Sequence, residues 1–210
     1  QRQAVEREPL VRVWAAGATD KIQPTGRAEL PHTGPWDASL RRVRIEGVRG
    51  EHVPFHLVVT ADRMDISGVT VELSDLRCGD AVLPASEVKV YLEYFSKVYA
   101  ASGKNGRKGY WPDALVPLTR PFAVKSSRRD RGPVLRNQPL WVDVEVPPQQ
   151  RPGVYAGQVV VKVEGKEVGE LTIELKGWDV TLPVKRNFPV QFGFFYGREI
   201  ARIHGVEQDS

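Results

Sequence analysis

The stretch LWVDVEV, residues 140–146, decides the fold class. Apolar and charged residues alternate along it, and successive side chains of a β-strand point to opposite faces. One face is therefore apolar and the other is polar, as in a strand with a single side against a hydrophobic core. The residues on the apolar face are Leu140, Val142, Val144 and Val146.

Similar alternation recurs on both sides of this stretch, and it predicts strands at 10–14, 42–46, 55–59, 69–73, 88–95, 159–163 and 171–175. The link EGKE at 164–167 predicts a hairpin between the last two strands. Pro152-Gly153 predicts a type II turn before the strand pair. The connections are too short or too rich in Gly and Pro for crossover helices. We therefore predict an all-β, mostly antiparallel β-sandwich of eight or nine strands, Ig-like or jelly-roll-like.

Composition supports a globular domain with long loops. The chain has 210 residues, of which 41% are hydrophobic and 27% are charged. Residues 19–39 and 102–137 read as long loops, and loops of such length are usually functional or mobile.

No apolar run reaches the roughly 18 residues of a membrane span. A first residue of Gln is compatible with a cleaved signal peptide, and we expect a secreted or periplasmic bacterial protein.

Positive charge gathers in one segment. Residues 100–137 hold nine positive and two negative side chains, a net +7, whereas the whole chain is +4. A nucleic-acid binder more often spreads basic residues along a groove or helix with interleaved aromatics, so no nucleic-acid partner is expected. The predicted candidates for binding an anionic ligand are Arg128, Arg129 and Arg131.

The last 25 residues differ from the rest of the chain. A dense aromatic strand includes Phe192, Phe194, Phe195 and Tyr196. A strand that is apolar on both faces needs cover on both faces. We therefore predict a sandwich domain over residues 1–187, and in residues 188–210 the start of a following barrel-like domain or a strand covered by a partner chain.

Catalytic motifs are missing from the sequence. It contains no nucleophile elbow, phosphate-binding loop or dinucleotide-binding fingerprint. The lone Cys78 excludes an intrachain disulfide and a cysteine-rich metal site. On one strand His52 and His56 would stand about 13 Å apart, too far to share a metal ion. We expect no catalytic residue, metal or cofactor in this chain.

One segment suggests a ligand. In the stretch GYWPD, residues 109–113, an aromatic pair stands beside a carboxylate, a combination that can stack on a sugar ring and bond its hydroxyls. Alternatively, the two rings fix a long loop to the sandwich while the carboxylate caps a turn. The candidate carbohydrate-binding residues are Tyr110, Trp111 and Asp113.

Several motifs together resemble the amino-terminal domain of glycoside hydrolase family 123 and its relatives of unknown function. They are YWPDALVP at 110–117, NQPLWVDVEVP at 137–147, PGVYAG at 152–157 and VTLP at 180–183. Residues 50–59 are similar to a further family motif, with His56 standing where glutamine is usual. The motifs occur in the family's order from about Val13 to Pro183.

The resemblance implies a β-sandwich placed before a TIM-barrel glycosidase domain that acts on terminal N-acetyl-β-galactosamine with help from the substrate's acetamido group. The family's catalytic pair is an adjacent Asp-Glu in the barrel. These 210 residues contain no Asp-Glu dipeptide, so no catalytic role transfers to this chain.

Three functions remain open at this stage. The first is a non-catalytic accessory domain that supports a catalytic barrel in the same chain. The second is a stand-alone module that binds or adheres to glycans, anionic ones included. The third is a structural component that pairs its aromatic carboxy-terminal strand with another chain.

Overall fold

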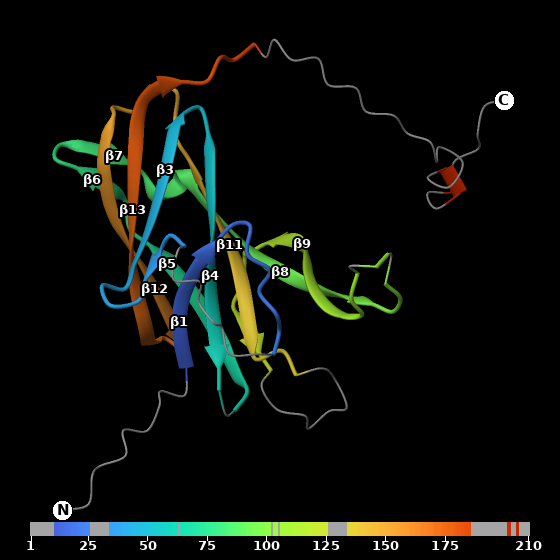
Figure 1. Cartoon of the computed structure of the whole chain (residues 1–210). Helices are drawn as coiled ribbons and strands as arrows, with labels where there is room; N and C mark the ends of the chain where they lie inside the picture. The colour runs from blue at the N-terminus through green and yellow to red at the C-terminus, as the bar shows by residue number, and fades with distance from the viewer. Residues whose placement is uncertain are drawn as a thin grey trace, which may run out of the picture.

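The computed structural model describes residues 11–25, 34–62, 64–101, 103–104, 106–125, 134–185, 201–202 and 205. Two β-sheets stack face to face in these residues (Figure 1), which confirms the predicted sandwich. The candidates Arg128, Arg129 and Arg131, and the aromatic residues Phe192, Phe194, Phe195 and Tyr196, lie outside the described residues.

The first sheet has five strands, and each strand is antiparallel to its neighbours. Its spatial order is β1 (Val11–Gly17), β4 (His52–Ala61), β11 (Asn137–Glu145), β8 (Val88–Val98) and β9 (Gly109–Pro117). β11 contains most of the stretch that predicted the fold. It lies at the centre of this sheet.

The second sheet is mixed, because β13 runs parallel to β3. Its order is β10 (Phe122–Val124), β5 (Ile66–Leu73), β12 (Gly153–Val163), β13 (Lys166–Thr181), β3 (Arg42–Arg49) and β2 (Trp36–Asp37). The short strands β6 (Leu76–Cys78) and β7 (Ala81–Leu83) form a hairpin at its side, where β6 also pairs with β12. A single 3-10 turn, Ala85–Glu87, precedes β8.

The described residues contain thirteen strands, more than the eight or nine predicted. Four of the strands have only two or three residues, too few to show a period. The predicted loop 102–137 was wrong in part, because it contains β9 and β10, and the loop 19–39 contains β2. β9 tolerates its internal Pro112 because it is the edge strand of its sheet.

The predicted hairpin between β12 and β13 is confirmed. Val163 pairs with Lys166, which leaves a two-residue turn of Glu164 and Gly165. Both turn residues have positive φ, 50° and 79°, as a tight type I′ turn requires. Gly165 adopts such a conformation without steric cost.

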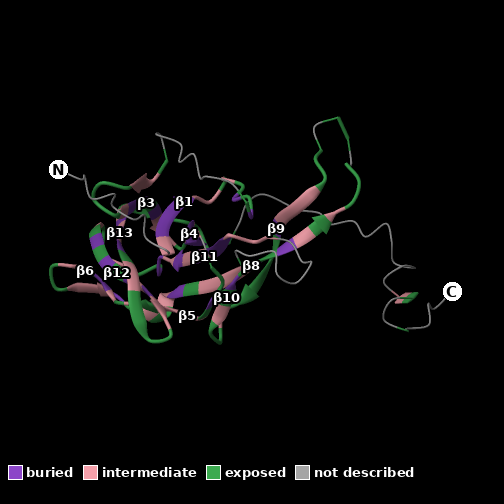
Figure 2. Ribbon diagram, turned by 90° about the horizontal axis from the view of Figure 1, so that it is seen from below, coloured by how far each residue is buried: buried purple, intermediate pink, exposed green. Residues whose placement is uncertain are grey.

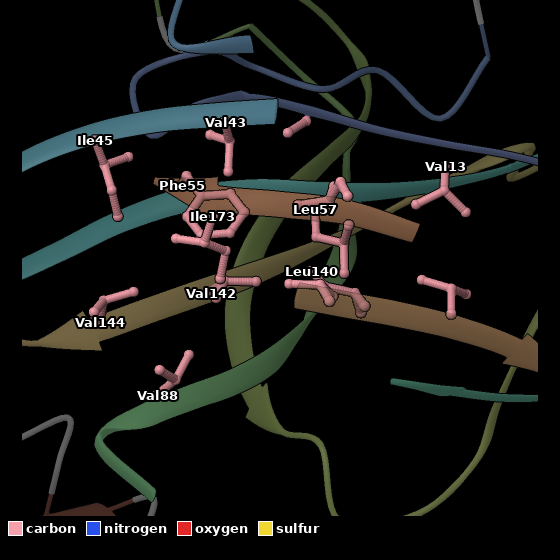
Figure 3. Packing of buried hydrophobic residues seen from close by; sticks show 14 of the residues in the cluster. Val13, Val43, Ile45, Phe55, Leu57, Val88, Leu140, Val142, Val144 and Ile173 are labelled. Atoms are coloured by element: carbon pink, nitrogen blue, oxygen red, sulfur yellow. The ribbon is translucent and has the colours of Figure 1, made fainter. Parts of the chain in front are cut away.

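The core fills the space between the two sheets (Figure 3). The predicted apolar face of β11 points into it, with Leu140 opposite Leu57 and Val142 opposite Phe55. Ile173 of β13 faces them from the second sheet, and all five of these side chains are fully buried. Burial of this size is the main force that holds the sheets together.

Candidate functional site

β8 and β9 extend beyond the sandwich as a two-stranded arm. β8 pairs with the central strand β11 only over residues 88–92, whereas it pairs with β9 as far as Val98. Figure 2 shows this ribbon projecting away from the two sheets. We call residues 94–98 together with 109–114 the arm. It carries all three predicted carbohydrate-binding residues.

The arm divides those three residues between its two faces. Trp111 pairs with Ser96, whose hydroxyl lies 3.4 Å from an oxygen of Asp113, so Trp111 and Asp113 share a face. Tyr110 pairs with Lys97 and lies on the opposite face. The Lys97 ammonium stands 5.9 Å from the Tyr110 ring and 4.8 Å from the Tyr99 ring. The separation follows from the alternation of side chains along a strand.

Trp111 also fixes the loop at the tip of the arm. Its indole nitrogen donates a hydrogen bond of 3.1 Å to the Arg107 carbonyl. The exposed Tyr94 lies on the same face as Trp111, because it stands two residues from Ser96 along β8. This face therefore presents two aromatic side chains and a carboxylate, and its second aromatic ring is Tyr94 rather than the predicted Tyr110.

The outer face of the five-stranded sheet holds a buried pair of ionisable side chains. His56 Nδ1 lies 2.5 Å from Glu93 Oε1, and these residues are only 3% and 4% exposed. The other ring nitrogen, Nε2, lies 3.3 Å from the Ala18 carbonyl. Trp141 packs edge-on against the imidazole, with the ring centres 5.3 Å apart.

A second polar network lies further along the same face. Asn137 donates from Nδ2 to the Gln23 carbonyl over 2.9 Å, and its backbone N–H donates to the Pro24 carbonyl. Its side-chain oxygen accepts a hydrogen bond of 2.8 Å from Thr60, whose oxygen in turn accepts from the Trp14 indole. We call residues 18–25 the strap, because these bonds and His56 hold them across the sheet.

The strap covers a small apolar cluster outside the main core. Ile22 packs there against Trp14 and Val58. The buried polar groups beneath the strap are thus bonded to its backbone carbonyls and to one another. This geometry gives His56 and Asn137 a structural role.

Neither Glu93 nor Asn137 was among the residues predicted from the sequence. Each stands at a polar position that looks ordinary in the sequence, because its partner lies far away along the chain. The separation is 37 residues for Glu93 and His56, and 77 residues for Asn137 and Thr60. His52 and His56 were predicted to be too far apart for a shared metal ion, and each instead contacts its own carboxylate. Over the part of the chain that the structure describes, no three His, Cys, Asp or Glu side chains gather as metal ligands would.

A shallow groove of about 380 Å³ lies on the second sheet, where β6 and the residues before it meet β12 and β13. Its polar groups already bond to each other. Gln158 N donates to the Ser74 hydroxyl, and Arg77 donates to Asp75. Asp75 also accepts from the Ala85 backbone. The groove therefore offers few unpaired groups to a ligand.

Comparison with known proteins identifies the class of the chain. The family model described as "Glycoside hydrolase 123 N-terminal domain" matches residues 33–163, more than half of the sequence. The chain belongs to this family, and the resemblance noted in its motifs is thereby confirmed. A search of curated proteins found no match.

Among solved structures, the chain is similar to a family 123 glycoside hydrolase from Clostridium perfringens, with a TM-score of 0.63 and 11% identity. The match covers 82% of this chain and 28% of the hydrolase, so the chain spans under a third of that protein's length. At this identity the likeness shows the fold alone.

Two further similarities have lower TM-scores and carry no argument. One is to AvmM, a macrocyclisation catalyst, with a TM-score of 0.38, 8% identity, and coverage of 67% of this chain and 87% of AvmM. The other is to the N-terminal domain of PorA, with a TM-score of 0.36, 15% identity, and coverage of 79% and 97%. Within the described residues, no helix is long and apolar enough to span a membrane.

Proposed function

We propose that this chain is the non-catalytic accessory domain of a secreted or periplasmic glycoside hydrolase, and that it supports a catalytic barrel in the same polypeptide. The family match over residues 33–163 carries the proposal. The fold of the Clostridium hydrolase supports it, because there the corresponding region is a minor part of a longer enzyme. That enzyme is described as hydrolysing glycolipid glycans. We propose a glycan ending in N-acetyl-β-galactosamine as the substrate of the parent enzyme.

The test has two parts. The isolated chain is expected to release no product from a chromogenic N-acetyl-β-galactosaminide, whereas the parent enzyme hydrolyses it. Removing the sandwich from the parent is expected to lower the thermal midpoint of the catalytic domain, measured by calorimetry. Turnover by the isolated chain, or a catalytic domain that is equally stable alone, would contradict the proposal.

Glycan binding by the arm is a second candidate function, favoured by one observation. The face with Trp111, Tyr94 and Asp113 lies on a ribbon that extends past the sandwich, and Tyr94 is exposed on it. Aromatic rings with a nearby carboxylate present the apolar surface and the acceptor that a sugar needs. We expect Trp111→Ala to weaken glycan binding at least tenfold in calorimetry, and Tyr99→Ala on the opposite face to leave it unchanged.

Trp111→Ala also removes the hydrogen bond to Arg107, so a second variant is needed. Asp113→Asn retains the side-chain shape and an acceptor toward Ser96 while it removes the charge. A reversal of Arg128 and Arg129 tests for an anionic glycan. If no glycan binds, or if binding survives all three changes, the arm is a structural element alone.

A further inference from the structure

The outer face of β13 changes from polar to apolar at one point. Up to Lys176 its outward side chains are polar, as suits a sheet face in water. From Trp178 to the end of β13 at Thr181, and in the residues that follow it, every second residue is a large hydrophobic side chain. These residues, which we call the exit strip, are Trp178, Val180, Leu182 and Val184, and they are 44%, 55%, 45% and 97% exposed.

The backbone of the exit strip is held in place as far as Leu182, although its side chains are uncovered. β13 leaves its partner β12 after Gly177 and continues along β3 alone. Arg49 of β3 donates to Asp179 over 2.9 Å and to the Thr181 hydroxyl over 2.7 Å, and its carbonyl accepts from the Leu182 N–H. Asp179 and Thr181 thus turn toward Arg49, and Trp178 and Val180 alternate with them along the strand, although the pairing with β3 is irregular at this point.

Trp178 has a fixed orientation. Its indole nitrogen donates to a carboxylate oxygen of Glu46 over 2.9 Å, and the Lys176 ammonium stands 3.4 Å from its ring centre. Both contacts leave a large part of the ring accessible. An aromatic side chain that is already oriented loses little entropy on binding, and such residues often dominate the energy of an interface.

We propose that the exit strip is the surface on which the catalytic domain of the same polypeptide docks. This proposal rests on the proposed function. Four large apolar side chains within seven residues form an exposed row, and exposed apolar rows of this kind mark interaction sites. The strip occupies the last described residues before the segment 188–210 that was predicted to start the next domain, so the following part of the chain is the nearest partner. Docking there fixes the orientation of the catalytic domain relative to the end of β13.

The test uses the parent enzyme with Val180→Ser and Leu182→Ser together. Both side chains are exposed in the sandwich, so the isolated chain is expected to keep its thermal midpoint and its circular dichroism spectrum. In the parent enzyme the double variant is expected to lower the midpoint of the catalytic domain by about 5 °C, because apolar contacts between the exit strip and that domain are lost. Limited proteolysis between the domains is expected to speed up in parallel. Leu40→Ser, at an exposed apolar side chain in the turn between β2 and β3, is the matched control and should change neither readout.

The outcomes separate this proposal from the function on which it rests. If deletion of the sandwich destabilises the catalytic domain but the double variant does not, the accessory role stands and the exit strip is the wrong surface. If neither change has an effect, both proposals fail. If the isolated chain forms a dimer that the double variant dissociates, the strip binds a second copy and the docking proposal is overturned.

Discussion

Replacing Glu93 with leucine is expected to destabilise the sandwich by about 3–5 kcal/mol, the usual cost of removing one partner of a buried pair. Leucine fills a similar volume but leaves Nδ1 of His56 without its partner in a site that water does not reach. Denaturant unfolding followed by tryptophan fluorescence measures the change. Glu145→Leu is the matched control, because Glu145 forms a looser ion pair of 3.4 Å with Lys89 near the surface, and we expect it to cost less than about 1 kcal/mol.

The hydrogen-bond partners of His56 show why the pair is held so firmly. The Ala18 carbonyl can only accept, so the ring nitrogen facing it carries a hydrogen. Nδ1 and Glu93 Oε1, at 2.5 Å, then require one proton between them, whichever atom holds it. The pair then carries no net charge, and neither ionisable group is buried without a partner.

Two further variants test this arrangement. In Glu93→Gln the new amide can donate to Nδ1 while Nε2 still donates to Ala18, so we expect a loss below about 1.5 kcal/mol. The double variant His56→Leu with Glu93→Leu removes both partners, and it is expected to be more stable than the sum of the single changes predicts. Additive losses would show that the two side chains do not depend on each other.

Alternation of side chains made the fold predictable, because it reports directly on which residues face the core. It located β11 and β4 within a few residues and assigned the inner face of β11 correctly. It could not find β9, because Pro112 and Pro117 and the neighbouring glycines are typical of loops. Only the pairing with β8 shows that this stretch is an edge strand, where proline is tolerated.

The candidate site was less predictable, because its geometry depends on register between distant segments. The sequence grouped Tyr110 with Trp111, but the strand conformation of β9 puts them on opposite faces. His56 and Glu93 belong to strands that β11 separates, and no local pattern connects them. The exit strip could not be predicted for a similar reason. A row of alternating apolar residues looks the same in the sequence whether or not other residues cover it.

Asn137→Leu is expected to release the strap and to destabilise the domain by about 2–4 kcal/mol, because two buried polar groups lose the partner that Asn137 provides. These are the Gln23 carbonyl, to which Asn137 donates, and the Thr60 hydroxyl, from which it accepts. Asn137 is the first residue of the motif at 137–147, and its side chain and backbone N–H hold the strap at two successive carbonyls. Denaturant unfolding measures the global loss.

Trypsin reports on the strap itself. Lys21 lies in the strap beside the buried Ile22, so cleavage after Lys21 requires the strap to lift from the sheet. Asn137→Leu is expected to speed this cleavage by at least tenfold, more than it speeds cleavage elsewhere. Gln150→Leu is the matched control, because it removes a side-chain bond to the Val82 carbonyl far from the strap along the chain. Equal acceleration of all sites in Asn137→Leu would mean that the strap opens only when the whole domain unfolds, and Asn137 would then be an ordinary core residue without a specific anchoring role.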